Sequence, residues 1–280
     1  MVQSATRTMR RLVPNVLVRV RHVEPELYLS VRLRQHLGLI ARGSGRYEPR
    51  YVKVLRSCVE VGDVVFDVGA NIGFYATLFG RWVGSGGGVV AYEPDPDNAR
   101  LLRRNLAAFP ASVVRPVALG STTGVSAFSR DGITGQTGHI GAGPTYGEVQ
   151  FRGGKQISID VSITTLDAEV ERMNAVPDVV KIDAEGAEYE ILCGGQRLMR
   201  SGRPLIVAET SNWRYDMKQT DTPSGAVIEL LRNHEYVVYD LDRGLEIEHG
   251  EQPWMVLAVP DERRSEPRMR RVIAETEALS

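Results

Sequence analysis

The sequence predicts an α/β protein built around a doubly wound, mostly parallel β-sheet. From Gly62 onward, short apolar runs alternate with helical segments, which is typical of parallel strands joined by crossover helices. A turn containing Gly69 and Gly73 links the first strand to the first helix. The last two strands have no long helix between them, so we expect the parallel sheet to end in an antiparallel hairpin.

Seven apolar segments are expected to form the strands of this sheet. They are residues 64–70, 89–93, 113–119, 179–183, 205–209, 236–240 and 254–259. Helices are predicted over 74–83 and 97–106. The second is capped by Asp95 or Asp97, and Pro96 suits its first turn.

The main domain is expected to span residues 61–260 and to contain one insertion. Residues 120–160 are rich in Gly, Ser and Thr, and we interpret them as a lid or binding loop, with disorder as the alternative. The alternating stretch K-Q-I-S-I-D-V-S-I within this insertion predicts an extended or edge strand. Residues 261–280 form a charged C-terminal tail, which we expect to be a solvated helix or a frayed end.

The N-terminal extension over 1–60 is strongly basic, although the whole chain has a net charge of -1. It contains 11 Arg, one Lys and four Glu, which gives +8 and leaves -9 for the remainder. Leu12, Val16, Leu17 and Val20 occur at helical spacing and predict one or two amphipathic helices. This helical extension is interpreted as a solvated cap on the main domain. A docking surface for an anionic partner or a membrane face is the alternative.

Several classes of protein are disfavoured by composition. No apolar run approaches the roughly 18 residues of a membrane helix, and the N-terminus lacks the apolar core of a signal peptide. Cys58 and Cys193 form no disulfide framework or metal-binding spacing, so buried free thiols in a cytoplasmic protein are expected. The acidic main domain disfavours a nucleic-acid partner.

The turn after the first strand predicts a nucleotide-like cofactor site. A strand, a glycine turn and a helix N-terminus form such a corner in doubly wound sheets. Asn71 stands where a dinucleotide loop has its second glycine, so it would crowd a pyrophosphate. S-adenosylmethionine has no phosphates, and its ammonium group suits the carboxylate of Asp67. Glu93, at the end of the second strand, is placed to accept hydrogen bonds from both ribose hydroxyls.

Five segments of the chain resemble, in order and spacing, the FkbM family of S-adenosylmethionine-dependent methyltransferases. They are V-F-D-V-G-A-N-I-G-F-Y, A-Y-E-P-D-P-D-N-A-R-L-L-R-R-N, P-V-A-L-G, T-T-L-D and V-V-K-I-D-A-E-G-A-E-Y-E-I-L-C-G-G, and they lie within about residues 60–210. The resemblance implies a class I methyltransferase fold and O-methylation of a hydroxyl on a sugar, glycan or polyketide-like acceptor. With it, we assign Asp67, Gly69, Asn71, Gly73, Glu93 and Ala118 to the cofactor site.

Asp183 is the leading candidate for the general base or the acceptor anchor. It ends the strand expected beside the first one, where it would face the transferred methyl group. Glu185 shares this role, and Lys181 is expected to be the buried partner that keeps Asp183 ionised. His139 in the insertion is the alternative base, although a surface loop position is the simpler interpretation for it.

A divalent cation is possible but is not required by the sequence. Asp183, Glu185 and Glu209 would supply the oxygen ligands that such a cation prefers. Three other functions remain as alternatives: a non-catalytic S-adenosylmethionine-binding partner protein, an NAD-linked oxidoreductase and a nucleic-acid amino-methyltransferase. The last would carry an Asp/Asn-Pro-Pro-aromatic stretch where this chain has I-D-A-E-G.

Overall fold

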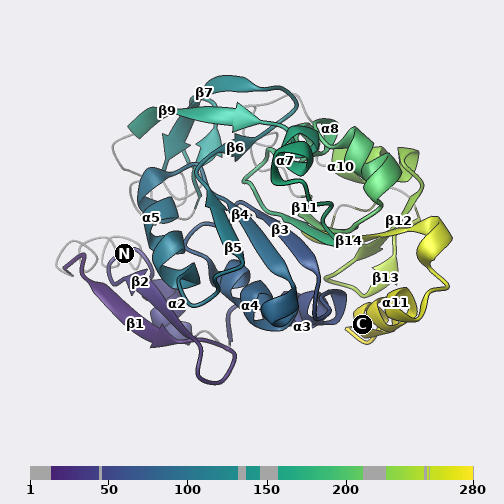
Figure 1. Cartoon of the computed structure of the whole chain (residues 1–280), viewed down its shortest axis with the longest axis horizontal. Helices are drawn as coiled ribbons and strands as arrows, with labels where there is room; N and C mark the ends of the chain where they lie inside the picture. The colour runs from purple at the N-terminus through teal and green to yellow at the C-terminus, as the bar shows by residue number, and fades with distance from the viewer. Residues whose placement is uncertain are drawn as a thin grey trace.

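The computed structural model describes residues 14–43, 46–131, 137–145, 157–210, 225–248, 251 and 253–279. Its main feature is an eight-stranded sheet. The strands are β3 (Val64–Val68), β4 (Gly88–Tyr92), β5 (Ser112–Arg115), β10 (Val179–Ile182), β11 (Leu205–Glu209), β12 (Tyr236–Asp240), β13 (Leu245–Glu246) and β14 (Met255–Pro260). Their order across the sheet is β5-β4-β3-β10-β11-β14-β12-β13 (Figure 1).

The predicted doubly wound, mostly parallel sheet is confirmed. β5, β4, β3, β10 and β11 run parallel to one another, and β14 is antiparallel to both β11 and β12. The C-terminal antiparallel hairpin is therefore present, and the short β13 adds an eighth strand to the seven expected. The segment 113–119 divides, because Ala118–Leu119 leaves the main sheet as β6 and pairs elsewhere.

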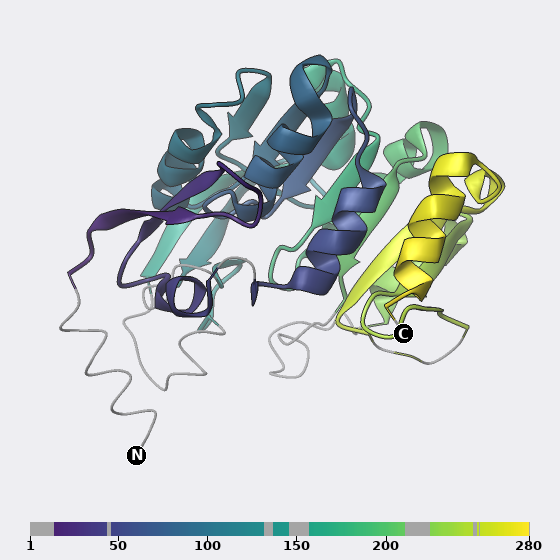
Figure 2. The ribbon, with the colours of Figure 1, turned by 90° about the horizontal axis from the view of Figure 1, so that it is seen from below.

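Helices cover both faces of the sheet, as Figures 1 and 2 show. Alternate strand residues enter opposite cores: Val65 packs with one apolar cluster and Phe66 with the other. The first cluster includes side chains from α3 (Pro49–Cys58), α4 (Phe74–Val83), α5 (Pro96–Leu106) and α11 (Pro267–Glu277). The second includes side chains from α7 (Leu166–Met173), α8 (Glu188–Cys193), the π-helix η3 (Leu198–Gly202) and α10 (Ala226–Asn233). Two further short helices are η2 (Gly84–Gly86) and η4 (Asp261–Arg263).

The first two predicted helices form where expected. Asp95 is the N-cap of α5, and its side chain accepts hydrogen bonds from the backbone N–H groups of Asp97 and Asn98. Pro96 occupies the first turn, where a backbone N–H would have no hydrogen-bond partner within the helix, so its absence costs nothing. This cap fixes the path of the chain immediately after β4.

The predicted helix over Leu17 to Val20 is wrong, because this segment is a strand. β1 (Leu17–Arg21) pairs antiparallel with β2 (Tyr28–Arg32). Val18 and Val20 are half-buried while Arg19 and Arg21 are exposed, so side-chain burial alternates every second residue, as expected for a strand. The helices α2 (Leu37–Arg42) and α3 then follow, whereas Leu12 lies outside the described residues.

The hairpin is attached to the main domain by a buried asparagine on α5. Asn105 exchanges hydrogen bonds with the backbone of Ser30, accepting one of 2.8 Å and donating one of 3.0 Å. The same amide group donates to the backbone carbonyl of Ile72 at 2.7 Å. One side chain thus connects β2, α5 and the turn after β3.

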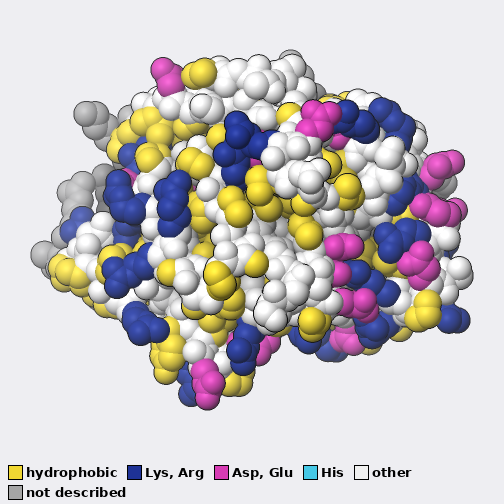
Figure 3. Space-filling view, viewed as in Figure 1, with side chains coloured by type: hydrophobic (Ala, Val, Ile, Leu, Met, Phe, Trp, Pro, Cys, Tyr) yellow, Lys and Arg dark blue, Asp and Glu magenta, His cyan; other side chains and the backbone are white. Residues whose placement is uncertain are grey.

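Charge is unevenly distributed over the face seen in Figure 3. Over the hairpin and α5 the basic side chains have few acidic neighbours, whereas toward α11 both signs are interspersed (Figure 3). The exposed arginines of β1 and α5 are Arg19, Arg21, Arg100, Arg103 and Arg104. In the part of the chain that the structure describes, no helix has the length and apolar character needed to cross a bilayer.

The glycine-rich insertion contributes a second, four-stranded sheet of order β6-β9-β7-β8. β7 (Gly124–Arg130) pairs antiparallel with β9 (Ile157–Thr164), and β8 (His139–Ile140) lies against β7. β9 confirms the strand predicted from the alternating stretch. Residues 132–136 and 146–156, where much of the predicted lid falls, lie outside the described residues.

The C-terminal segment contains the helix that was one of the two alternatives predicted for it, but this helix packs on the main domain and is not fully solvated. α11 lies beside α3 (Figure 2), and its Met269 and Val272 are buried in the core shared with that helix. Arg268 adds an ion pair with the largely buried Asp63 at 2.5 Å.

Neither cysteine forms a disulfide bond. Cys58, at the end of α3, is a buried free thiol, and Cys193 is a half-buried free thiol.

Truncating Met269 tests this packing. Met269→Ala is expected to lower the free energy of unfolding by about 2–5 kcal/mol, because it removes buried apolar volume between α11 and α3. Urea denaturation followed by circular dichroism measures the change. The exposed Arg270→Ala on the same helix is the control, and equal stability losses in the two variants would contradict the packing role.

Candidate active site

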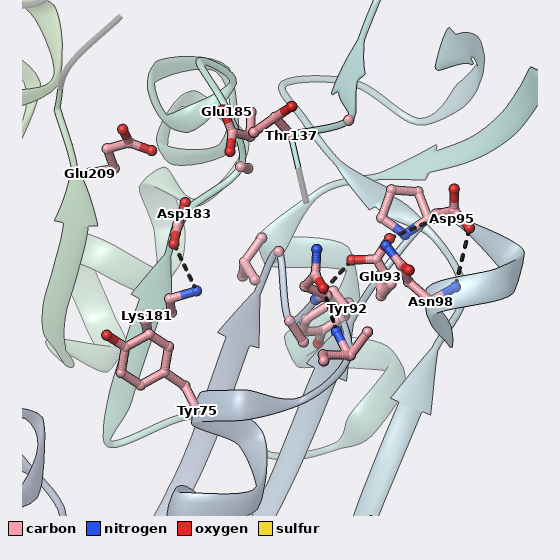
Figure 4. Close-up of a pocket in the computed structure, with 18 of the residues that line it drawn as sticks. Tyr75, Tyr92, Glu93, Asp95, Asn98, Thr137, Lys181, Asp183, Glu185 and Glu209 are labelled. Atoms are coloured by element: carbon pink, nitrogen blue, oxygen red, sulfur yellow. Dashed lines mark hydrogen bonds and ion pairs between the residues drawn. The ribbon is translucent and has the colours of Figure 1, made fainter. Parts of the chain in front are cut away.

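A cavity of about 300 Å³ opens at the carboxyl ends of β3, β4, β10 and β11. β4 lies on one side of β3 and β10 on the other, so the cavity is at the point where the strand order reverses. Ligands of doubly wound sheets bind at this position. Figure 4 shows Glu93, Asp95 and Asn98 on one side of the cavity and Lys181, Asp183 and Glu209 on the other.

Gly69 brings the chain segments after β3 and β10 into direct contact. Its φ is 74°, and a Cβ atom at this position would lie 1.8 Å from the backbone carbonyl oxygen of Asp183. Only glycine fits such an approach. The first glycine of the turn therefore sets the distance between the predicted cofactor loop and the predicted catalytic carboxylate.

Asn71 and Glu93 form the floor of the predicted ribose site. The backbone N–H groups of Asn71 and Asp95 each donate to one Glu93 carboxylate oxygen at 2.8 Å. Asn71 has a φ of 51°, a conformation that asparagine tolerates, and its side-chain oxygen accepts from the Ile72 N–H. Burial raises the pKa of Glu93 to about 8. Each carboxylate oxygen keeps a second acceptor position for a ligand hydroxyl.

The structure brings four of the six predicted cofactor residues to the cavity wall. They are Gly69, Asn71, Glu93 and Ala118. Gly73 lies behind the wall, where a Cβ atom would be 2.6 Å from Leu102 on α5, so its role is the close packing of α4 on α5. Asp67 is fully buried and is not among the described residues that line the cavity. The expected direct contact of Asp67 with a cofactor ammonium group is therefore not supported.

Lys181 lies between Asp67 and Asp183. Its ammonium nitrogen is 3.4 Å from a carboxylate oxygen of each, which confirms the predicted pairing with Asp183 and adds a second partner. The β3–β10 register places Lys181 directly beside Asp67, and its ammonium group also lies over the Tyr75 ring. Burial alone would lower the pKa of Lys181, but Asp183 and Asp67 together raise it above its usual value. The lysine therefore stays charged.

The turn after Asp183 is held by a glutamate on α8. Glu188 accepts hydrogen bonds from the N–H groups of Ala184 at 2.7 Å and Gly186 at 3.3 Å. Glu185, between them, has a φ of 54°, a strained conformation for this residue. Burial raises the pKa of Glu188 to about 7. Sequence patterns place Glu188 in a helix, but its carboxylate is buried and fixes the loop that carries both predicted catalytic residues.

The N-terminal extension supplies part of the cavity wall, which no sequence pattern indicated. His36, Leu39, Tyr47 and Glu48 all line it. The Tyr75 hydroxyl donates a hydrogen bond to the Glu48 carboxylate. Burial raises the pKa of Glu48, while this hydrogen bond lowers it. Glu48 is one of four glutamates in residues 1–60, so its charge alone did not single it out.

The two secondary expectations are not supported. His139 is fully buried in β8 and is not among the described residues lining the cavity, so it is neither the alternative base nor a surface histidine. Within the described ranges, no three His, Cys, Asp or Glu residues form a group that could hold a metal ion. Asp183, Glu185 and Glu209, which were predicted as possible ligands, therefore do not form such a group. Asp183 is directed toward Lys181, and Glu209 stands apart on β11 (Figure 4).

Comparison with known proteins defines the family. The model of the methyltransferase FkbM domain matches residues 67–238, more than half of the chain, so the chain belongs to the FkbM methyltransferase family. This confirms the resemblance, and with the sheet topology it confirms the class I methyltransferase fold. An NAD-linked oxidoreductase is no longer an alternative.

Two curated relatives share this domain. The hexuronic acid methyltransferase AglP of Haloferax volcanii is 30% identical over 167 residues, covering 58% of this chain and 62% of that protein. The 31-O-demethyl-FK506 methyltransferase FkbM of Streptomyces tacrolimicus is 30% identical over 209 residues, covering 66% of this chain and 77% of that protein. The chain therefore spans less than two thirds of the length of AglP.

The crystal structure of methyltransferase FkbM from Methylobacillus flagellatus has a TM-score of 0.44 at 18% identity, covering 71% of this chain and 43% of that chain.

Removing the Lys181 charge tests the electrostatics of the site. Lys181→Met is expected to cost about 3–5 kcal/mol in the free energy of unfolding, because it leaves the buried Asp67 without its cation. Adding Asp67→Asn is expected to recover part of this loss. Lys53→Met, which removes an exposed pair with Glu275, is the control and should cost less than about 1 kcal/mol. Urea denaturation of all three variants measures the free energies of unfolding. If Lys181→Met costs no more than Lys53→Met, Lys181 is not the cation that stabilises the buried Asp67.

Proposed function

We propose that this protein is an S-adenosylmethionine-dependent O-methyltransferase acting on a hydroxyl of a sugar, glycan or polyketide-like acceptor. The observation that carries the proposal is the single cavity that Glu93 and Asp183 share on either side of β3. One carboxylate suits the ribose of a nucleoside cofactor, and the other suits a proton acceptor. Family membership supports methyl transfer as the reaction.

The residues present fit the cofactor. Glu93 retains acceptor positions for the two ribose hydroxyls after both of its backbone hydrogen bonds are counted. The turn from Gly69 to Asn71 lines the cavity with its backbone, and Val117, Ala118 and Leu119 offer an apolar wall for a base. When bound, S-adenosylmethionine supplies an electrophilic methyl group on a sulfonium.

In this proposal Asp183 takes the proton of the acceptor hydroxyl. The Lys181 ammonium group lies 3.4 Å from its carboxylate, and Glu188 fixes the backbone of the following turn. The side chain of Asp183 is 31% exposed, so it is accessible from the cavity, unlike Asp67. Glu185 shares the rim with it and orients the acceptor. Alignment of the acceptor oxygen is the main contribution that such a site makes to a displacement.

The relatives name two kinds of acceptor. AglP is named for hexuronic acid, and the Streptomyces protein is named for a demethylated oxygen of FK506. Both molecules present oxygen nucleophiles, which supports O-methylation here. The chain covers 62% of the first relative and 77% of the second. The acceptor of this protein therefore has to be identified by its own assay.

Cofactor affinity is expected to rise with pH through about 8. Glu93 has a pKa of about 8 without ligand, and ribose hydroxyls donate to its ionised form, so deprotonation favours binding. Glu93→Gln is expected to bind S-adenosylhomocysteine about 10–100-fold more weakly, since hydrogen bonds to charged groups contribute about 1.5–3 kcal/mol. The variant should also lose the pH dependence. Calorimetric titrations between about pH 6 and about pH 9 test both points, and a Glu93→Gln profile that matches the parent contradicts the ribose assignment.

Turnover is expected to depend on Asp183 and Glu185, whereas cofactor affinity is not. Asp183→Asn should lower kcat by about 100-fold or more, because a general base contributes about 10²–10⁴-fold, and Glu185→Gln should also be impaired. Transfer of labelled methyl groups to extracts of sugars, glycans and secondary metabolites provides the assay and identifies the acceptor. Asp178→Asn, an exposed residue at the opposite end of β10, is the matched control. Full activity in both site variants would disprove the catalytic assignment, and cofactor binding without any transfer would indicate a non-catalytic binding protein.

A further inference from the structure

The four-stranded sheet of the insertion contributes side chains to the cavity wall. Phe128 of β7 and Ile140 of β8 line the cavity, and so does Asp131, which follows the last residue of β7. That last residue is Arg130. Its side chain is not among the described residues that line the cavity, so it serves the site only through a neighbour.

Arg130 binds the first turn of α5 through three hydrogen bonds. Its Nε donates to one Asp95 carboxylate oxygen at 2.6 Å, and a terminal nitrogen donates to the other oxygen at 3.1 Å. The same terminal nitrogen donates to the Asp97 carboxylate at 2.5 Å. Paired charge-assisted bonds of this kind fix the geometry of both partners. The hydrogen bonds to Asp95 raise the pKa of Arg130, and the bond from Arg130 lowers the pKa of Asp97.

The cap of α5 does not need this arginine. Asp95 already accepts hydrogen bonds from the N–H groups of Asp97 and Asn98, and the helix dipole disfavours a cation at a helix N-terminus. What Arg130 adds is a connection between β7 and the loop after β4, across 35 positions of the chain. The side chains of Arg130 and Asp95 are mostly shielded from solvent, whereas the nearby Arg100–Asp97 pair is exposed.

Asp95 transmits this connection to Glu93. The Asp95 N–H donates to a Glu93 carboxylate oxygen at 2.8 Å, so the residue that Arg130 holds also orients the Glu93 carboxylate. Pro94 and Pro96 flank Asp95, and each has a fixed φ, which leaves this segment little freedom. A displacement of Asp95 would therefore rotate or release the Glu93 carboxylate.

We infer that Arg130 is a positioning residue for the ribose of the cofactor, because by fixing Asp95 it holds the Glu93 carboxylate in the orientation that two ribose hydroxyls require. This inference rests on the proposed function, which assigns the ribose to Glu93. It gives the insertion a part in cofactor binding, in addition to its side chains in the cavity wall.

Calorimetric titration of the full chain with S-adenosylhomocysteine tests this role. Arg130→Gln is expected to bind it about tenfold more weakly than the parent, because the paired bonds to Asp95 are lost. Arg130→Lys keeps the charge but not the paired geometry, and it should remain at least about threefold weaker. Arg100→Gln removes an exposed partner of the same Asp97 and is the control, with unchanged affinity.

A double-mutant cycle with Glu93→Gln separates positioning from a general structural effect. In the Glu93→Gln background, Arg130→Gln should change the affinity by less than about twofold, because the group through which Arg130 acts is already altered. A general loss of structure would weaken binding by the same factor in both backgrounds. Thermal unfolding without ligand identifies a variant that does not fold, and Arg130→Lys carries the same comparison if Arg130→Gln is unfolded.

The outcomes distinguish this role from the proposed function. If S-adenosylhomocysteine does not bind to the parent, the proposed function fails and the role of Arg130 fails with it. If it binds to the parent, and either folded Arg130 variant binds it as tightly, the positioning role alone is overturned. An equal loss of affinity in the parent and Glu93→Gln backgrounds overturns it as well.

Discussion

The ion cluster of Lys181 with Asp67 and Asp183 is the interaction on which the rest of the site depends. It forms because β10 and β3 pair in a register that places Lys181 beside Asp67, with Asp183 one step beyond the strand. A buried carboxylate without a cation would be costly, so this cluster constrains how the two central strands can pair. The close approach at Gly69 then brings the two loops together, and the cofactor and acceptor ends of the cavity meet at this point.

The two ends of the cavity use carboxylates in different ways. Each carboxylate oxygen of Glu93 accepts one backbone hydrogen bond, which fixes the orientation of the carboxylate. The remaining acceptor position of each oxygen can bind a ligand hydroxyl. Asp183 is paired with the Lys181 ammonium group and remains partly exposed, so its carboxylate can be reached from the cavity. Glu188 belongs to neither end, but by binding two N–H groups it determines where Asp183 and Glu185 lie.

The sheet was largely predictable from the sequence, because strands buried on both faces appear as continuous apolar runs between helices. One part of the cavity wall was predictable for the same kind of reason: Gly69, Asn71 and Glu93 line the cavity from positions that a strand-turn-helix corner dictates. The hairpin over Leu17–Arg32 was not, since a few valines separated by arginines fit both helical and strand periods until a pairing partner is known. The contributions of Tyr47 and Glu48 could not be found from local patterns, because they depend on how a distant segment folds back over the sheet. Local patterns also did not reveal that Asp67 is fully buried beside Lys181, which itself lines the cavity, or that His139 is fully buried in β8.

The attachment of the hairpin through Asn105 affects how this protein can diversify. The turn after β3 and the N-terminal segment share one buried amide, so the hairpin that precedes His36 and Glu48 is held in a fixed relation to that turn. Substitutions in that segment would therefore change one wall of the cavity while Gly69, Asn71 and Glu93 on the opposite wall stay the same.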